Sequence, residues 1–291
     1  MTRIVCIGGG HGLSAALAAA KQLTDEVTAV VTAADDGGSS GVLRVLLGIP
    51  APGDLRMAIA ALANDEQAAL LQYRFTAGDL AGHPLGNLMI AALADIEGDF
   101  VRAVEETARI AGIAGRVYPA SPVPLTLHAT VNGARIDGQL AIAQGPGAVE
   151  RLWLEPEEPP ATPQAVEAIG EADLVVLGPG SLFTSVLAAL LVPGIRRAVR
   201  DARRVAFALN LQHQAGETLG LDAAAHLDAM TRHVARLRID AVLAHEGPAD
   251  GILRPVTLDE SAIRMPVVRA DLATAGVHDP AKFAAVLKTL T

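Results

Sequence analysis

A glycine cluster near the N-terminus is the first feature of this sequence that could bind a ligand. Gly8-Gly9-Gly10-His11-Gly12 follows an apolar run at residues 4–7, and a helix-compatible run begins at Leu13. A strand, a glycine turn and a helix in this order are typical of nucleotide-binding α/β domains, because glycine lets backbone N–H groups approach a phosphate and the helix directs its positive end toward it. The spacing Gly10-x-Gly12-x-x-Ala15 fits the relaxed dinucleotide-binding fingerprint. A turn that only packs the helix closely against the strand is the alternative.

Two carboxylates and two serines follow the next predicted strand. The segment Asp35-Asp36-Gly37-Gly38-Ser39-Ser40 comes directly after a β-branched run at residues 27–32. The carboxyl end of a parallel strand is where open α/β sheets bind ligands, which favours a site over a solvated surface turn. Adjacent carboxylates would repel a phosphate, so we expect them to bind Mg²⁺ or to accept hydrogen bonds from sugar hydroxyls.

A second glycine turn repeats the design of the first. Gly178-Pro179-Gly180-Ser181 lies between a buried-strand run at residues 173–177 and an apolar helical run at 186–191. Loops at the carboxyl ends of parallel strands face one crevice, so we expect one loop to hold a diphosphate and the other a second anionic group. Asn210 and Gln214 follow the strand predicted at 205–209, and their amides could contact a base or a sugar.

Arg56 and Asn87 are two further candidates at predicted helix starts. Asp54 is the predicted N-cap of the helix that contains Arg56. A cation in the first turn is disfavoured by the helix dipole, so Arg56 should have an anionic partner, either an acid of this chain or a ligand phosphate. Asn87 opens an apolar helix, and His83, before a proline, is predicted to be a turn residue.

Composition limits the class of protein. The chain has 291 residues, 51% of them hydrophobic but only 3% aromatic, and a net charge of −9 that argues against a nucleic-acid-binding surface. Its single cysteine, Cys6, excludes a disulfide framework. No apolar run reaches the length of a membrane span and no signal peptide is evident, so we expect a soluble, unexported protein.

The candidate residues lie between strand-like and helix-like runs that alternate along the chain. This order predicts a Rossmann-like α/β fold with a doubly wound, mostly parallel sheet. A β-hairpin insertion is expected at about residues 124–144, where Asn132-Gly133 marks a tight turn between two strand-like runs, the second reaching Ile142. Because no linker or repeat interrupts the chain, residues 1–291 should form a single domain.

Six blocks in this order resemble the YvcK/CofD-like family, in particular its YvcK branch, the gluconeogenesis factors. They cover most of the chain and begin at Gly8, Ala34, Pro52, Gly82, Leu177 and Gln214. The resemblance implies a Rossmann-like fold, residence in the cytoplasm, binding of sugar nucleotides such as UDP-N-acetylglucosamine, and support of cell-wall synthesis and cell shape during gluconeogenic growth. The sister CofD branch transfers a phospholactyl group to a deazaflavin precursor with a divalent metal.

The chain departs from the family pattern at three places. His11 stands where a threonine is expected, Leu211-Gln212-His213 replaces a Met-Thr pattern, and Val277 stands where an arginine is expected before the terminal His-Asp. These changes would remove a hydroxyl near the phosphate and an arginine contact to the sugar nucleotide.

We therefore predict a sugar-nucleotide-binding regulatory protein that forms a homo-oligomer, has no membrane span and acts on an unidentified protein partner. A metal-dependent transferase of the 2-phospho-L-lactate transferase type is the alternative, and an NAD-dependent oxidoreductase, suggested by the fold alone, lacks a proton relay. We assign no catalytic residue and place Mg²⁺, if it binds, on Asp35 and Asp36. The predicted ligand-binding residues are Gly9, Gly10, His11, Gly12, Leu13, Asp35, Asp36, Ser39, Ser40, Arg56, Asn87, Gly178, Pro179, Gly180, Ser181, Asn210 and Gln214.

Overall fold

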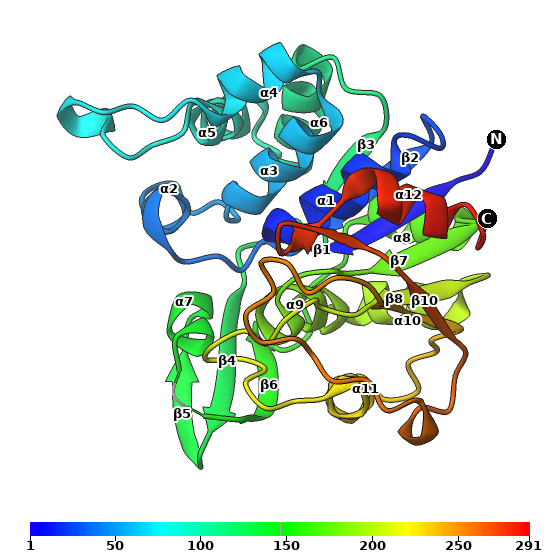
Figure 1. The fold of residues 1–291 in the computed structure, drawn as a ribbon. Coiled ribbons are helices and arrows are strands. Elements are labelled where there is room, and N and C mark those ends of the chain that lie inside the picture. Colours follow the sequence, from blue (N-terminus) through cyan, green and yellow to red (C-terminus); the bar gives the residue numbers. More distant parts are fainter. Residues whose placement is uncertain (146) are drawn as a thin grey trace.

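A seven-stranded parallel sheet forms the centre of the molecule (Figure 1). The computed structural model describes residues 1–145 and 147–291. The strand order is β10-β9-β8-β7-β1-β2-β3. The strands are β1 (Ile4–Gly8), β2 (Val27–Val31), β3 (Arg116–Pro119), β7 (Leu174–Leu177), β8 (Val205–Ala208), β9 (Ala241–His245) and β10 (Val267–Ala270).

The strand order confirms the predicted doubly wound sheet. β1 pairs in parallel with β2 on one side and with β7 on the other, so the chain builds outward from β1 in one direction and later from β7 in the other. Reversal of the winding at β1 and β7 creates a topological switch point, where the loops after these strands part to opposite faces of the sheet.

Alternate residues of β1 enter two separate cores. Ile4 and Cys6 pack in one core, while Val5 and Ile7 pack in the other. Burial on both faces is typical of parallel sheets and explains the continuous apolar runs of the sequence. The thiol of Cys6 is completely buried, and this burial raises its pKa to about 12.

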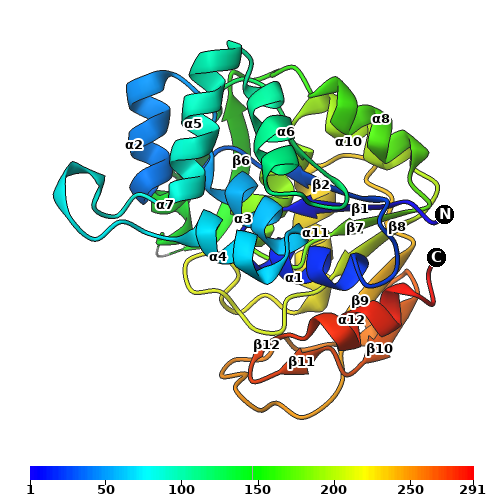
Figure 2. The ribbon, with the colours of Figure 1, turned by 90° about the horizontal axis from the view of Figure 1, so that it is seen from above.

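Helices cover both faces of the sheet (Figures 1 and 2). One face carries α1 (Gly10–Ala20), α3 (Gly53–Leu62) and α12 (Pro280–Leu287), with α1 in contact with both of the others. The core on the other face includes residues of α8 (Pro163–Glu171), α9 (Ala188–Leu190), α10 (Pro193–Asp201) and α11 (Ala223–His233). The π-helical segment Leu182–Leu187 leads into α9 in place of the regular helix expected at 186–191.

A helical layer rises from the β2 side of the sheet. It contains α2 (Gly38–Leu47), α4 (Asp65–Gln72), α5 (Leu85–Glu97) and α6 (Phe100–Ile110). The segment between α4 and α5, with the short helix Gly78–Leu80, extends away from the body in both views (Figures 1 and 2).

The predicted hairpin is present but has a third strand. β4 (Thr126–Val131) and β5 (Ala134–Asp137) are antiparallel around Asn132 and Gly133, and β6 (Val149–Glu155) pairs with the other edge of β4. The expected strand through Ile142 is wrong, because Gly138 with φ of 97° ends the strand and α7 (Gln139–Ala143) follows. A two-stranded ribbon, β11 (Ala273–Thr274) with β12 (Val277–His278), lies near the C-terminus together with the short helix Glu260–Ala262.

In the described part of the chain, no single helix has the length and apolar character to cross a membrane; only Leu182–Leu190 with Pro193–Asp201, counted across an 83° bend, has the required length and composition.

Candidate ligand-binding site

The two glycine loops meet at the switch point. A Cβ atom on Gly12 would overlap the carbonyl oxygen of Pro179, and one on Gly180 would lie 3.3 Å from the carbonyl oxygen of Gly9. Only glycine at position 12 permits this approach of the two backbones. The two glycine loops therefore lie side by side at the carboxyl ends of β1 and β7, as expected for loops that follow neighbouring parallel strands.

A crevice of about 200 Å³ opens over the paired loops. Its lining includes six of the predicted residues, His11, Gly12, Pro179, Gly180, Asn210 and Gln214. The remaining lining residues are Ala15, Leu211, Gln212, Gly276, Val277 and His278. Gly276, Val277 and His278 lie far along the chain and carry no local motif, so only the family pattern around Val277 pointed to them.

The N-terminus of α1 has one side-chain acceptor, Asp54, on the N–H of Gly10, and its other first-turn amides have none among the described residues. Its N-cap, Gly9, provides no side-chain cap, and the first turn contains no acidic residue. The free backbone N–H groups of a first turn and the positive end of the helix dipole together form an anion site. Leu13 contributes only its backbone, because its side chain is 1% exposed and packs in the core.

The second glycine loop is held by side chains of the protein. Gly180 N–H donates to Asn210 Oδ1 at 2.9 Å, Asn210 Nδ2 donates to Gln214 Oε1 at 3.3 Å, and Gln214 Nε2 donates to Ser181 Oγ at 3.1 Å. Asn210 and Gln214 are therefore positioned at the crevice by a closed set of hydrogen bonds.

A buried glutamate, which the sequence did not reveal, caps the helical segment after this loop. Glu217 is 5% exposed, and its carboxylate accepts hydrogen bonds from Phe183 N, from Thr184 N and from Thr184 Oγ1. Burial raises the pKa of Glu217, although these hydrogen bonds oppose the shift. The carboxylate occupies the place that an anionic ligand would take at this helical start.

Asp54 is the carboxylate nearest to the first glycine loop. The prediction that Asp54 is the N-cap of α3 is wrong, because Pro52 takes that position and Asp54 lies in the first turn. Its side chain lies against Gly9. Burial and the charge of Asp35 raise the pKa of Asp54 to about 7, against the opposing effects of the Gly10 N–H and Arg56.

The two predicted carboxylates point in different directions. Asp35 Oδ1 accepts a hydrogen bond from Gly37 N within its own turn, at 2.9 Å. Asp36 Oδ1 accepts one from Leu140 N at the start of α7, also at 2.9 Å, and its other oxygen lies against Gly138. Asp36 thus joins the β2 loop to the hairpin insertion, while Asp35 remains beside Asp54.

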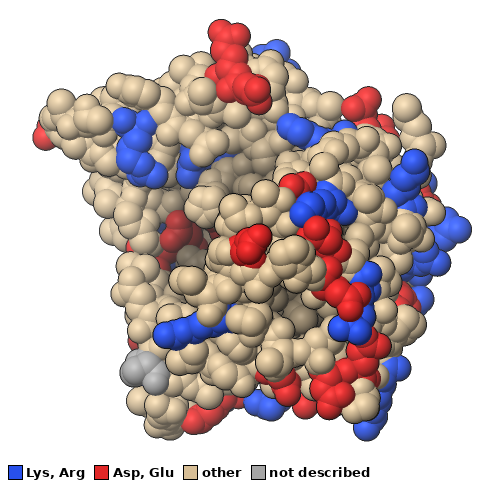
Figure 3. Space-filling view, in the orientation of Figure 1, with Lys and Arg blue, Asp and Glu red and all other residues tan. Residues whose placement is uncertain are grey.

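Polar residues of the helical layer form a second group beside this acidic one. Arg56, with 8% of its surface exposed, donates from Nε to Asn87 Oδ1, and Asn87 donates to Ser39 Oγ. His83 also contacts Ser39, so this predicted turn residue belongs to the group. Burial and the nearby charge of Arg74 lower the pKa of Arg56, and Asp54 and Asp35 oppose the shift. Figure 3 shows acidic and basic side chains around a hollow on the face where α2 and α7 lie in Figure 1.

Two further predicted glycines shape the backbone, and one predicted serine is buried. Gly10 and Gly178 have φ of 63° and 75°, which only glycine adopts readily, and so shape the two turns. Ser40 is buried, with its hydroxyl facing the Cα of Gly53.

Within residues 1–145 and 147–291, no three His, Cys, Asp or Glu side chains are grouped as a metal centre.

A doubly wound sheet whose polar loops meet at the switch point defines a Rossmann-like α/β protein. Residues 4–274 match the family model described as 2-phospho-L-lactate transferase CofD, and the chain belongs to this CofD-like family.

Curated relatives and solved structures agree with that assignment. A "Putative gluconeogenesis factor" of Mycobacterium tuberculosis is 48% identical over 304 residues, covering 98% of this chain and 89% of the relative. The gluconeogenesis factor of Bacillus subtilis is 40% identical over 265 residues, covering 89% and 84%. A crystal structure of a UPF0052 family member from Bacillus halodurans matches with a TM-score of 0.94 at 35% identity, over 99% of this chain and 98% of that one.

Proposed function

We propose that this protein binds a UDP-sugar, such as UDP-N-acetylglucosamine, and acts as a regulator without converting it. The observation that carries the proposal is the crevice at the switch point, where the first-turn amides of His11 and Gly12 adjoin two fixed side-chain amides, Asn210 and Gln214. An anion-binding helix start beside amide groups matches a ligand with a diphosphate at one end and a polar base or acetamido group at the other.

The two glycine loops would have different roles in this complex. The amides of His11 and Gly12 at the start of α1 would bind the diphosphate, because the side chain of Asp54 takes only the N–H of Gly10 there. The loop at Gly180 would shape the crevice, since Asn210 already accepts its N–H. Val277 lines the crevice where the family pattern has an arginine, so the ligand would depend on the α1 loop for charge compensation.

The names of the relatives suggest the biological role. Proteins called gluconeogenesis factors match nearly the whole chain, and we infer a related role for this protein. It would act in the cytoplasm as a homo-oligomer, support cell-wall synthesis and cell shape during gluconeogenic growth, and respond to the level of its sugar nucleotide.

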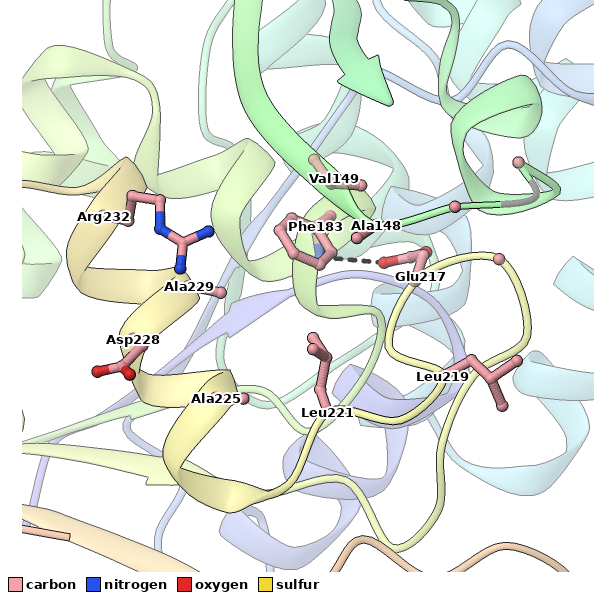
Figure 4. Close-up of a pocket in the computed structure, with 13 residues that line it drawn as sticks. Ala148, Val149, Phe183, Glu217, Leu219, Leu221, Ala225, Asp228, Ala229 and Arg232 are labelled. Atoms are coloured by element: carbon pink, nitrogen blue, oxygen red, sulfur yellow. Dashed lines mark hydrogen bonds between the residues drawn. The ribbon is translucent and has the colours of Figure 1, made fainter. Parts of the chain in front are cut away.

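One observation favours a transferase as the second candidate. A cavity of about 330 Å³ lies behind the loop that carries Gln214, between the start of β6 and α11. Figure 4 shows Phe183 at its centre, Leu221 facing it and Arg232 directed toward it from α11. The lining combines apolar walls with one cation, Arg232, and two carboxylates, Asp228 and Glu217, and a cavity of this size would suit a flat acceptor molecule, as a CofD-type transfer reaction requires.

A divalent metal would serve either function, and the carboxylates present fit one. Asp35 and Asp54 lie close enough for the charge of Asp35 to raise the pKa of Asp54, a repulsion that a cation would remove. Mg²⁺ needs only one or two protein carboxylates when phosphates and water complete its shell. Asp35 and Asp54 would hold the ion, and Asp36 would orient the loop through Leu140. The ion would neutralise phosphate charge.

Separate measurements of binding and turnover test the proposal. Titration calorimetry with UDP-N-acetylglucosamine, UDP, GDP and NAD should show preference for the UDP-sugar. Incubation of that ligand with Mg²⁺ and flat aromatic acceptors should then yield no product. A Mg²⁺-dependent product that disappears in Phe183→Ala or Asp35→Asn would favour the transferase, and failure to bind any UDP compound would reject the regulator.

A further inference from the structure

Helix α2 exposes an apolar patch to solvent. Val45 and Leu46 keep 83% and 73% of their surface exposed, and Val42 and Leu47 keep 45% and 50%. The helix packs against α5, and of its five large apolar side chains only Leu43 is buried. Single exposed apolar residues are common, but four on one short helix form the kind of patch that marks an interaction site. We call these four residues the α2 patch.

A projecting arm, residues 73–82, lies on the same side of the molecule as the α2 patch. Both views show the arm and α2 at the left, with the arm extending away from the body (Figures 1 and 2). All residues of the arm except Phe75 are exposed, including the apolar Tyr73 and Leu80. Ser39 Oγ, in the first turn of α2, lies 2.8 Å from His83 Nδ1 at the base of the arm. The arm and α2 are therefore joined where they leave the body.

Hydrogen bonds give the arm a fixed conformation. Phe75 N–H donates to the carbonyl of His83 at 3.1 Å, and Gly82 N–H donates to the carbonyl of Phe75 at 2.8 Å. The rings of Tyr73 and Phe75 meet edge to face, with their centroids 5.3 Å apart. A segment that is already ordered loses little conformational entropy when it docks, so this arm is suited to binding a partner.

Charge favours a second copy of this chain as the partner. The protein has a net charge of −9, so two copies repel each other wherever acidic faces meet. The one charged residue of α2 is Arg44, which donates to Thr126 Oγ1 at 2.6 Å, and the arm carries one cation, Arg74, and one anion, Asp79. A surface without net acidic charge can face its own copy across a two-fold axis. Nucleic acid or an anionic membrane would require a set of basic side chains, which α2 does not have.

The size of the exposed surface fits a dimer. An interface of standard size takes about 20–30 residues from each copy. Residues 38–48 contain six exposed residues and the arm contains nine, so the two segments supply most of that number. The α2 patch would form the apolar centre of such an interface and the more polar arm its rim.

We propose that the α2 patch and the arm form the interface of a homodimer, in which each copy places this surface against the same surface of the other. The inference rests on the homo-oligomer included in the proposed function and assigns its interface. The crevice at the switch point lies outside this surface, so dimerisation and binding of a UDP-sugar can be measured separately.

Sedimentation velocity over a range of protein concentrations is the first test. The wild-type protein should dimerise, and Leu46→Glu should raise the dissociation constant of the dimer at least tenfold, because it puts a carboxylate into the interface from both copies. Leu80→Glu should weaken the dimer in the same direction through the arm. Leu253→Glu is the matched control, since it makes the same change at an exposed leucine outside the surface, and it should leave the dissociation constant unchanged. Circular dichroism spectra identical to the wild type would show that the variants fold.

Thiol reactivity is the second test and does not depend on disrupting the dimer. Cys6 is completely buried, so a cysteine introduced at the surface is the thiol that an aromatic disulfide reagent detects. Leu46→Cys should react at the rate of a free thiol in dilute solution, and at least tenfold more slowly at concentrations where the protein is dimeric. Leu253→Cys should react at the same rate under both conditions.

Three results would overturn the proposed interface. A dimer that persists in Leu46→Glu and Leu80→Glu would leave the homo-oligomer in place and reject this surface, and so would a Leu46→Cys thiol equally reactive at all concentrations. A monomeric wild-type protein would reject the dimer itself, and its binding to phosphatidylglycerol vesicles, lost in Leu46→Glu, would assign the surface to a membrane.

Calorimetric titration of the wild type and Leu46→Glu with UDP-N-acetylglucosamine separates the two proposals. A monomeric Leu46→Glu variant that binds this ligand as the wild type does supports an interface distinct from the crevice. Failure of the dimeric wild-type protein to bind it would count against the proposed function alone.

Discussion

Asn210 Oδ1 accepts the backbone N–H of Gly180 at 2.9 Å, and this contact makes the two glycine loops unequal. Both loops follow buried strands and precede helical segments, so their sequences look equivalent. In the second loop, Asn210 takes the N–H of Gly180 and Glu217 takes those of Phe183 and Thr184. The loop before α1 keeps first-turn donors at His11 and Gly12, because the side chain of Asp54 takes only the N–H of Gly10.

Replacement of Asn210 by aspartate should weaken ligand binding with little loss of stability. The new side chain can still accept the Gly180 N–H, but it loses the donor to Gln214 and places a negative charge in the crevice, where it would repel a diphosphate. We expect the dissociation constant for UDP-N-acetylglucosamine to rise at least tenfold and the free energy of unfolding to fall by about 1 kcal/mol. Calorimetric titration and urea denaturation measure the two effects.

Asn132→Asp is the matched control, because it makes the same change in an exposed hairpin turn. It should leave the affinity unaltered. Equal weakening in both variants would mean that net charge, and not a contact in the crevice, governs binding.

Gly12→Ala should damage both the fold and the site. The added methyl group would overlap the carbonyl of Pro179, so the two loops must separate. Overpacking of this kind costs about 1–3 kcal/mol. Gly170→Ala, at a helical glycine in α8 with open space around it, should instead gain a few tenths of a kcal/mol or more. Thermal unfolding of both variants checks this pair, and equal melting temperatures would show that the loop contact tolerates a Cβ atom.

The fold was predictable because its signals are local. Buried strands 4–7, 27–32 and 173–177 read as apolar runs, glycine turns follow two of them, and Asn132-Gly133 marks the hairpin. The end of β5 was missed because the apolar residues Leu140, Ala141 and Ile142 follow it, and only the positive φ of Gly138 shows that the strand stops.

The site was predictable only where a motif lies directly after a strand. Asp54 and His83 were interpreted from local position, as a helix cap and a turn residue, whereas their partners are brought to them by other elements. Glu217 and His278 act through burial and through contacts with distant segments. Such roles depend on tertiary packing, which a single sequence does not encode in any short pattern.

The buried cap formed by Glu217 should be a major contributor to stability. Glu217→Ala would leave three donors, Phe183 N, Thr184 N and Thr184 Oγ1, without their acceptor, at a cost of about 3 kcal/mol. Glu217→Gln keeps one oxygen for the two backbone N–H groups, and the Thr184 hydroxyl can rotate to accept from the amide, so about 1 kcal/mol is expected. Urea denaturation distinguishes the variants. If alanine and glutamine destabilise equally, the carboxylate charge matters more than the hydrogen bonds.

Asp54 should make the protein less stable as the pH rises from about 4 to about 7. Its pKa is raised from 3.8 to about 7 by burial and by Asp35, so within this window the folded state holds a proton that the unfolded state has lost. Ionisation of the buried carboxyl group costs free energy in the folded state, so the free energy of unfolding declines with pH until Asp54 is fully charged. Asp54→Asn removes this penalty, so the variant should match the wild type near pH 4 and exceed it at pH 8 by on the order of 2 kcal/mol. Metal-free denaturation curves between these values, with exposed Asp95→Asn as the control, measure the difference. An Asp54→Asn advantage that does not grow with pH would show that the carboxylate ionises without cost beside Gly10.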